Sequence, residues 1–521
     1  MKTLIPLFLL LFGFQTIFAQ HWYQKQAFAA SIECDDCREG FSVSVLNGRA
    51  FVANYFAFGG AVGLYEKDSI SRWQFKQQIF PLDIEPGIEF GYSIAQTDEY
   101  LFAGSIYNFR DQTGGNLIGH AGAAYVFTRG SNGLWQQTQK LIPSERGESF
   151  YFGHAMVSVG EYLAVSANWN TVVNQVGDSI ERAGAVYLFE KDTSGFWIET
   201  QSLRLTDPKR QDEFGDAIAM SETQLFVGVP QKTRLDLNAD TLQQKGAVYV
   251  YQKDSTGSWI ERQQLVPSTL TSGDGLGQAI SYQQQTLFVG APGSAQVYVF
   301  QQDSSGFWSE TQILSVADSI SNRPVSFGAS VAVDGRYAVI GAPHADRYGA
   351  CWMFEELGGT WQQMQHLTAD YDPVPTSTEA FGRSVSLSGK QVLIGMPFRN
   401  AMIPNPNNTP YSYRVGGVFF YEFTESPLSL EQQSPAQSLA ISPNPCQGFA
   451  QIDFELAQSQ NLLLRVTDLS GKVVYQEALG IRPVGKQERT INTATLSPGI
   501  YLVSVLGEWV HTTSKLLISA H

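Results

Sequence analysis

Hydrophobic and polar residues alternate in short runs along this chain, and one such run recurs seven times. Each copy begins with tryptophan, followed by glutamine four residues later and an apolar residue six residues later. The tryptophans are Trp22, Trp73, Trp135, Trp197, Trp259, Trp308 and Trp361. Because both offsets are even, the three side chains share one face of a β-strand. The pattern predicts one such strand in every copy of a repeated unit.

Three further apolar segments accompany each tryptophan strand. One follows a glycine, as at Gly153 and Gly215, a second is typified by 287–292, and a third by 246–251. Short turns containing glycine, such as 253–257, lead into the tryptophan strand. We expect no amphipathic helix of useful length. Four short antiparallel strands repeated seven times predict an all-β fold, a seven-bladed β-propeller.

The ends of the repeat region predict that the ring is closed. The last repeat stops at its third strand, 418–423, and no tryptophan strand follows it. The missing strand occurs at the other end of the region, as 22–28. The N-terminal strand is therefore expected to complete the last blade, an arrangement that an open solenoid does not need.

Paired motifs within the repeats carry a family resemblance. Phe-Gly occurs at 90–91, 152–153, 214–215, 327–328 and 381–382, and Gly-Ala-Pro at 290–292 and 341–343. Residues 20–423 thus resemble the FG-GAP repeat, which forms the seven-bladed propeller of integrin α subunits and occurs in many secreted bacterial proteins. Calcium-binding members of that family carry an Asp-x-Asp-x-Asp-Gly loop between the first two strands. The corresponding turn here is short, as at 333–336, so calcium is not carried over.

Two small clusters have spacings that suggest ligands or a cross-link. Asp236, Asn238 and Asp240 present alternating oxygen ligands, like the start of a calcium loop, but the following Gly and the distal acidic ligand are missing, so a solvated polar loop is the favoured interpretation. Cys34 and Cys37 have the spacing of a redox motif or half a zinc site, with no second half nearby. A local disulfide between them is the favoured interpretation. No cofactor is predicted.

The two ends of the chain predict export. Residues 1–19 combine Lys2, an apolar stretch and a small-residue cleavage site, as in a signal peptide. That stretch is shorter than the roughly 20 residues of a membrane span, and no later run is long enough. Residues 424–438 are rich in serine, proline and glutamine and indicate a linker.

Residues 439–521 alternate apolar strands with Pro/Gly turns, which predicts a small β-sandwich. By itself such a domain could be a carbohydrate binder. The segment resembles the type A sorting domain of the type IX secretion system. This resemblance implies the secretion machinery as a partner. It also implies a location outside the cell or on its outer surface, reached through the periplasm.

Composition and missing motifs narrow the function. The chain has 49 acidic and 34 basic side chains, and its net charge of −15 argues against nucleic acid as a partner. Neither a Gly-x-Ser-x-Gly elbow nor a His-Glu-x-x-His motif is present. We therefore expect a secreted or surface recognition and adhesion protein without catalytic activity. A polysaccharide-active or other hydrolase with carboxylates from different blades is the alternative, and a surface-layer component a third.

Insertions between the second and third strands predict where a ligand binds. They span 105–121, 168–183, 231–245 and 398–415, longer than usual hairpin connections of about 2–5 residues. These loops emerge on one side of a propeller, where His154 and His344 also fall, as catalytic or ordinary loop histidines. The candidate contacts with a glycan or protein ligand are Tyr107, Phe109, Trp169, Asn168 and Asn170. Packing of these loops against the propeller is the alternative explanation.

Overall fold

A computed structural model describes most of the chain. The described residues are 18–29, 37–55, 57–174, 176–232, 234–235, 241–242, 245–316, 326–345, 348–369, 379–403, 411–414, 416–427, 439–456, 460–468, 473–507 and 511–519. They fall into two compact units, a larger one of residues 20–425 and a smaller one that contains residues 426–521. The expected signal peptide and linker lie almost wholly outside the described residues.

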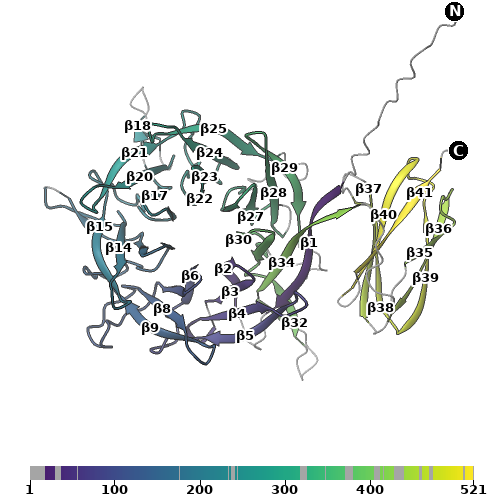
Figure 1. Ribbon diagram of the computed structural model, residues 1–521, viewed down its shortest axis with the longest axis horizontal. Coiled ribbons are helices and arrows are strands. Elements are labelled where there is room, and N and C mark those ends of the chain that lie inside the picture. The colour runs from purple at the N-terminus through teal and green to yellow at the C-terminus, as the bar shows by residue number, and fades with distance from the viewer. Residues whose placement is uncertain are drawn as a thin grey trace, which may run out of the picture. The chain divides into compact units, whose positions relative to one another are not determined.

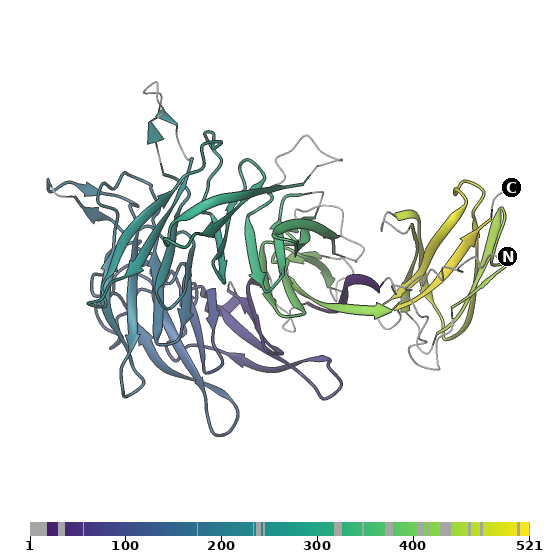
Figure 2. The ribbon, with the colours of Figure 1, turned by 45° about the horizontal axis from the view of Figure 1, so that its top comes forward.

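The larger unit consists of four-stranded antiparallel sheets arranged around a common centre, like the blades of a propeller (Figures 1 and 2). Sheet 1 contains β2 (Glu39–Leu46), β3 (Arg49–Asn54), β4 (Ala61–Lys67) and β5 (Trp73–Ile79). Sheet 2 contains β6 (Phe90–Gln96), β7 (Tyr100–Ser105), β8 (Ala123–Arg129) and β9 (Trp135–Leu141). Sheet 3 contains β10 (Met156–Val159), β11 (Tyr162–Ala167), β14 (Ala185–Lys191) and β15 (Trp197–Leu203).

The same order continues around the ring. Sheet 4 contains β16 (Ile218–Met220), β17 (Gln224–Val229), β20 (Ala247–Lys253) and β21 (Trp259–Leu265). Sheet 5 contains β22 (Ala279–Gln283), β23 (Thr286–Ala291), β24 (Gln296–Gln302) and β25 (Trp308–Ser315). Sheet 6 contains β26 (Ser330–Asp334), β27 (Tyr337–Ala342), β28 (Ala350–Leu357) and β29 (Thr360–Leu367).

Sheet 7 joins the two ends of the larger unit. It contains β30 (Ser384–Ser388), β31 (Gln391–Gly395) and β34 (Gly417–Pro427), and its outer strand is β1 (Phe18–Ala29). The N-terminal strand thus pairs with the C-terminal strand of the unit, as the sequence predicts. Among the described residues the only helical element is a single 3₁₀ turn, Ala57–Gly59. The predicted all-β class is confirmed.

The recurring Trp–Gln pair forms a hydrogen-bonded belt between neighbouring sheets. In sheets 2 and 3, Gln139 Nε2 donates to the Trp197 carbonyl at 2.8 Å, and Trp197 N donates to Gln139 Oε1 at 2.9 Å. The same link closes the ring, where Gln365 bonds the backbone N and O of Trp22 at 2.8 and 3.0 Å. All the repeated tryptophans are buried. Buried backbone groups without a partner are costly, which explains why glutamine recurs at this offset.

Glycine contacts explain why Phe-Gly and Gly-x-Pro occur together. A β-carbon on Gly290 of β23 would lie 2.0 Å from the Gly328 carbonyl oxygen at the start of sheet 6. Gly328 itself has a φ of +93°, a conformation that favours glycine. The glycine of one motif therefore packs on the glycine of the other in the next sheet.

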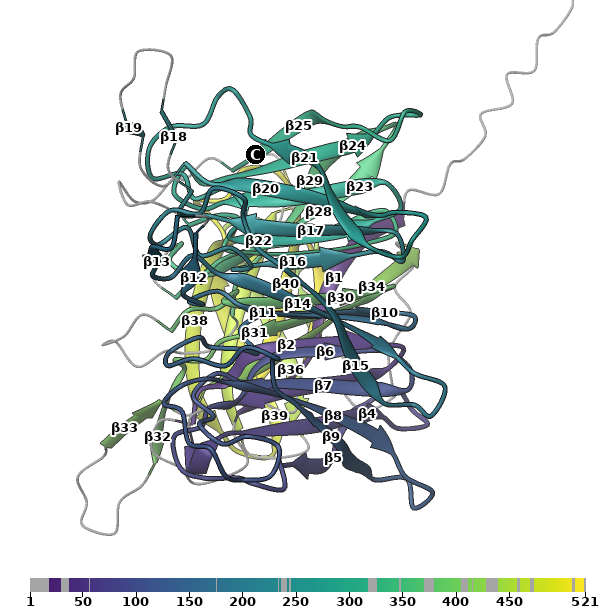
Figure 3. The same cartoon turned by 90° about the vertical axis from the view of Figure 1, so that its left-hand side faces the viewer.

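Three hairpins lie within the long insertions. They are β12 (Val172–Val173) with β13 (Ser179–Ile180), β18 (Arg234–Leu235) with β19 (Thr241–Leu242), and β32 (Asn400–Ile403) with β33 (Tyr411–Arg414). Figure 3 shows all three projecting from the same face of the ring. The connection from the second to the third strand of each sheet lies on this face, and we call it the insertion face.

The smaller unit is a two-sheet β domain. One sheet has the order β35 (Ala440–Ser442), β36 (Phe449–Leu456), β39 (Gly485–Asn492). The other has the order β38 (Val473–Arg482), β37 (Gln460–Asp468), β40 (Gly499–Gly507), β41 (His511–Ile518). A single cluster of buried apolar side chains, including Phe454, Leu464 and Val503, joins them.

Candidate functional site

Two sets of equivalent positions gather at the insertion face, on either side of the glycine that opens each sheet. The residues directly after this glycine form the inner ring: Phe41, Tyr92, His154, Asp216, Gln278, Ala329 and Arg383. The residues two before it form the outer ring: Arg38, Glu89, Tyr151, Glu213, Gly275, Ser326 and Ala380. Every outer-ring residue has a φ between +51° and +67°. Residues other than glycine rarely adopt this conformation, and its recurrence in every sheet makes it a feature of the repeated unit.

Contacts between successive inner-ring side chains bring four sheets and the closing sheet together. The Arg383 guanidinium lies 4.9 Å from the Phe41 ring centre, and Phe41 lies 5.2 Å from Tyr92. Tyr92 is 5.3 Å from the His154 ring, and His154 Nε2 is 3.9 Å from Asp216 Oδ1. Side chains from sheets 7, 1, 2, 3 and 4 thus form one continuous row, which we call the axial row.

Burial and charge shift the titration of this group. Burial lowers the pKa of His154, opposed by the negative charge of Asp216 and assisted by the positive charge of Arg383. Burial also raises the pKa of Tyr92. Asp216 accepts a hydrogen bond from Asn168 Nδ2 at 3.1 Å. Perturbed groups that converge from different elements are typical of functional sites.

Two glutamates of the outer ring flank Tyr151, because they occupy the same position in sheets 2 and 4. Burial raises the pKa of Glu89 to about 7, opposed by the positive charge of Arg38. Burial and the negative charge of Asp216 raise the pKa of Glu213 to about 7, opposed by Arg182. Among the described residues, no side chain donates a hydrogen bond to either carboxylate. Two half-buried carboxylates without donors are suited to accept hydrogen bonds from a ligand.

An aromatic cluster adjoins Tyr151 between sheets 2 and 3. The Tyr151 ring centre lies 4.6 Å from Trp169 and 5.3 Å from Tyr107, and Tyr107 lies 4.6 Å from His120. The Arg182 guanidinium lies 3.6 Å from the Trp169 ring centre. Burial raises the pKa of Tyr151 to about 12, assisted by its neighbour Tyr107. Two of the predicted contact residues, Tyr107 and Trp169, therefore lie together beside the outer ring.

The other predicted contact residues occupy less accessible places. Asn168 and Asn170 are buried, with 2% and 1% exposure, and Asn170 Nδ2 donates to the Tyr187 hydroxyl at 2.9 Å. Phe109 packs partly buried against the apolar core between sheets 1 and 2. These contacts hold the bases of the insertions, and a role of these residues in binding stays a prediction.

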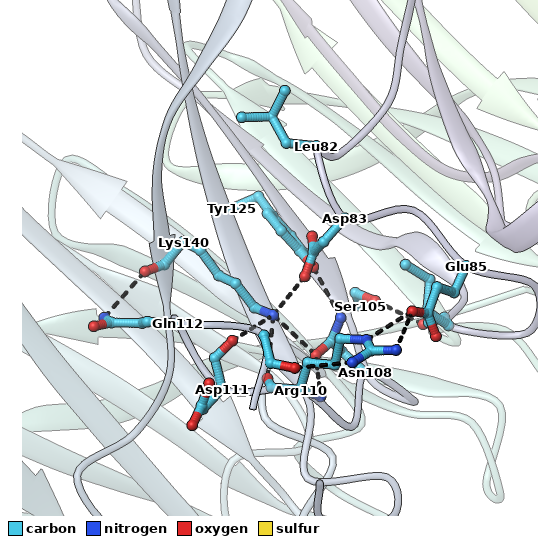
Figure 4. Close-up of polar contacts among 12 residues, drawn as sticks. Leu82, Asp83, Glu85, Ser105, Asn108, Arg110, Asp111, Gln112, Tyr125 and Lys140 are labelled. Atoms are coloured by element: carbon cyan, nitrogen blue, oxygen red, sulfur yellow. Dashed lines mark hydrogen bonds and ion pairs between the residues drawn. The ribbon is translucent and has the colours of Figure 1, made fainter. Parts of the chain in front are cut away.

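Lys140 anchors the base of the insertion in sheet 2 (Figure 4). Its ammonium group donates to Asp83 Oδ2 at 2.7 Å, Asn108 Oδ1 at 3.1 Å and the Arg110 carbonyl at 3.1 Å. Burial lowers the pKa of Lys140, opposed by its bonds to Asp83. The Arg110–Glu85 ion pair, 2.6 Å between Nη2 and Oε1, adds a second anchor. Tyr107 is thus presented by a loop with a fixed base.

The remaining predicted sites are resolved only in part. Asp236, Asn238, Asp240 and Cys34 lie outside the described residues, while Cys37 is disulfide-bonded and Cys351 is free. The Cys34–Cys37 pairing stays a prediction. Within the described ranges, no group of three or more His, Cys, Asp or Glu side chains could hold a metal ion. No helix there is long and apolar enough to cross a membrane.

A depression between sheets 5 and 6 lies at the turns from first to second strand, away from the insertion face. It holds about 280 Å³ and is lined by Gln283, Gln285, Gln302 and Glu356, among others. Its polar lining is mostly glutamine amides with one carboxylate, Glu356, so it offers less chemistry than the axial row.

Sequence-based prediction missed most residues of the axial row and the outer ring. It singled out His154 and His344, but not Glu89, Glu213 or Arg383. The signal was available, because each of these residues has a fixed offset from the glycine that opens its sheet. His344 is not part of the axial row, and its Nδ1 lies 3.1 Å from Oγ of the outer-ring residue Ser326.

Comparison with known proteins identifies the smaller unit. Residues 440–519 match the family described as the secretion system C-terminal sorting domain. This part of the chain is a type IX sorting domain, which marks exported proteins that are released or held on the outer surface. No curated protein sequence matches the chain.

Solved structures similar to the chain have propeller-like folds. A protein from Lactobacillus plantarum is 12% identical, with 91% of this chain and 100% of that one covered and a TM-score of 0.40. PorZ, a surface component of the type-IX secretion system of Porphyromonas gingivalis, is 12% identical, with 92% and 65% covered and a TM-score of 0.35. A periplasmic gluconolactonase of Pseudomonas aeruginosa is 15% identical, with 70% and 94% covered and a TM-score of 0.38. Such low similarity carries no functional argument.

Proposed function

We propose that residues 20–423 form a seven-bladed β-propeller of the FG-GAP type that recognises an extracellular ligand at its insertion face. A signal peptide at 1–19 starts export, and residues 424–438 link the propeller to the sorting domain at 439–521. The protein then acts as a secreted or surface-held recognition and adhesion protein. The observation that carries this proposal is the pair Glu89 and Glu213 beside the axial row, half-buried and without side-chain donors among the residues that the structure describes.

A hydrolase is the second candidate, favoured by one specific pair. Glu213 has a pKa of about 7, raised first by burial and then by the charge of Asp216, three residues further on. Asp216 accepts a hydrogen bond from Asn168 and lies near His154. A pair of carboxyl groups, one of them with a raised pKa, is the usual requirement for acid–base hydrolysis. Binding alone needs fewer of these features, so recognition remains our first choice.

The test uses the full secreted protein on an array of glycans and extracellular proteins. We expect binding that is lost in the double variant Glu89→Gln and Glu213→Gln without loss of folding, and no release of products. Release of sugar or peptide products, abolished by Glu213→Gln, would instead establish the hydrolase. Binding that is equal in the wild type and the double variant would refute an axial ligand site.

A further inference from the structure

The chemistry beside the outer ring identifies a class of ligand, an inference that rests on the proposed function. It begins with Trp169, whose ring is already occupied. The Arg182 guanidinium lies 3.6 Å from its centre and Tyr151 lies 4.6 Å away, tilted by 30°. Two groups this close cannot share one face of a ring, so they cover opposite faces. Trp169 therefore supports Tyr151 and Arg182 and has no open face for a ligand.

Tyr107 and His120 are the other aromatic side chains beside Tyr151, and their rings contact each other. Their rings lie 4.6 Å apart with an angle of 39° between them, and Tyr151 lies 5.3 Å from Tyr107. His120 is exposed and Tyr107 half-buried. His120 has a φ of +52°, so its backbone adopts a rarely populated conformation where the ring joins the cluster. We call Tyr107 and His120 the outer platform.

The charges around Tyr151 are balanced. Glu89 feels the positive charge of Arg38, and Glu213 feels that of Arg182. Asp216 and Arg383 lie in the axial row, on either side of His154. Three carboxylates thus accompany three guanidinium groups, and neither a strongly cationic nor a strongly anionic ligand gains from the total. Planar acceptors and donors beside aromatic faces suit hydroxyl groups on a ring with apolar faces.

We infer that the site takes a neutral glycan chain of at least two sugar rings. One ring lies over Tyr151 between Glu89 and Glu213, and the next lies on the outer platform. Sugar hydroxyls donate to the two carboxylates, which have no other side-chain donor among the described residues. The apolar face of each ring packs on an aromatic side chain, which also provides the larger part of the buried area.

The experiment measures affinity against chain length by calorimetry on the full secreted protein. The probes are cello-, xylo- and manno-oligosaccharides of one to six units, with galacturonate and chitosan oligomers as charged counterparts. We expect at least one neutral series to gain about tenfold in affinity from one ring to two or three, about 1.4 kcal/mol. We expect the charged oligomers to bind more weakly.

Variants separate the two positions. His120→Ala and Tyr107→Ala should remove most of the gain with chain length and leave the affinity for the single sugar within about twofold. Glu89→Gln and Glu213→Gln should weaken binding at every length. Leu117→Ala, in the same insertion and 63% exposed, is the matched control and should change nothing.

Several outcomes would overturn the inference. Preference for a charged oligomer, or a gain with length that His120→Ala leaves intact, would contradict it directly. Binding of an extracellular protein but of no neutral glycan, lost in the Glu89/Glu213 double variant, would leave the proposed function standing and remove this inference. If the double variant binds as tightly as the wild type, both the proposed function and this inference are refuted.

Discussion

Each repeat contributes one glutamine whose side chain satisfies two backbone groups of the next sheet. The link uses one side chain from each sheet and requires no strand pairing between sheets. It also fixes the spacing between neighbours, since the amide must reach both the N–H and the carbonyl of one tryptophan. Among the described residues, the outer strands of neighbouring sheets share no ladder of hydrogen bonds. The glutamine therefore supplies hydrogen bonds between these strands.

Replacing one of these glutamines should lower the stability of the protein measurably. Gln139→Leu leaves the N–H and carbonyl of Trp197 buried without their partner, and we expect a loss of about 2–4 kcal/mol in the free energy of unfolding. Urea unfolding monitored by tryptophan fluorescence provides the measurement. Gln136→Leu, at an exposed position on the same strand, is the control and should change stability by less than about 0.5 kcal/mol. Equal losses in the two variants would contradict the role of the belt.

The two outer-ring glutamates, Glu89 and Glu213, should lower the stability of the fold in the ionised form that we expect to bind the ligand. Their pKa values of about 7 exceed the usual 4.5, so the folded state holds protons that the unfolded chain has released. Their ionisation therefore destabilises the fold progressively as the pH rises from about 4.5 through 7. We expect Glu89→Gln and Glu213→Gln each to stabilise the protein by roughly 1 kcal/mol at pH 8, allowing for partial solvent exposure, and to have little effect at pH 4. A melting temperature that falls at pH 8 would contradict this.

Ligand affinity should follow the same titration in the opposite direction. A ligand that donates hydrogen bonds prefers the ionised carboxylates, so affinity should rise between pH 6 and pH 8. Arg38 and Tyr151 face Glu89, and Arg182 and Asp216 face Glu213. Of these groups, Tyr151 has a pKa too high to titrate in that range. In the double glutamine variant the residual affinity for a single sugar, which does not reach His120, should be independent of pH, and a persisting slope would assign the titration to another group.

At the scale of strands, the sequence predicts much of the fold but little of the site. The spacing of Trp73, Gln77 and Ile79 specifies one strand and its buried face, because side-chain period and burial are local properties. The meeting of Arg383 with Phe41 is not local. It requires ring closure, which places the start of sheet 7 beside that of sheet 1. Which glutamates lack donors likewise depends on neighbours contributed by other sheets.

Ring closure itself depends on β1. Deleting residues 20–28 removes the outer strand of sheet 7 and leaves the edge of β34 unpaired, together with the Trp22 link to Gln365. Unpaired strand edges promote association. We expect a lower melting temperature and oligomers in size-exclusion chromatography. Gln365→Leu, which breaks the belt link alone, should destabilise the protein and keep it monomeric. A deletion variant that stays monomeric with an unchanged melting temperature would show that β1 does not close the ring.

At the scale of the whole molecule, the candidate site and the sorting domain lie in different units. The axial row and the outer ring lie entirely in residues 20–425. Residues 440–519 form the sorting domain and have their own apolar core. Each core is internal to its unit, so each unit should fold without the other. A defect in export should then leave the binding properties of the larger unit intact.

Removing residues 440–521 should therefore stop export after the inner membrane and leave a folded larger unit in the periplasm. Cell fractionation with limited proteolysis of the retained protein measures both location and folding. Glu89→Gln is the matched control, because it changes the binding site and leaves the sorting domain untouched, and it should be exported in normal amounts. Fusing residues 424–521 to an unrelated periplasmic protein should carry that protein outside, since the signal lies in this segment alone. Normal amounts of the truncated protein outside the cell would place the export signal in the larger unit instead.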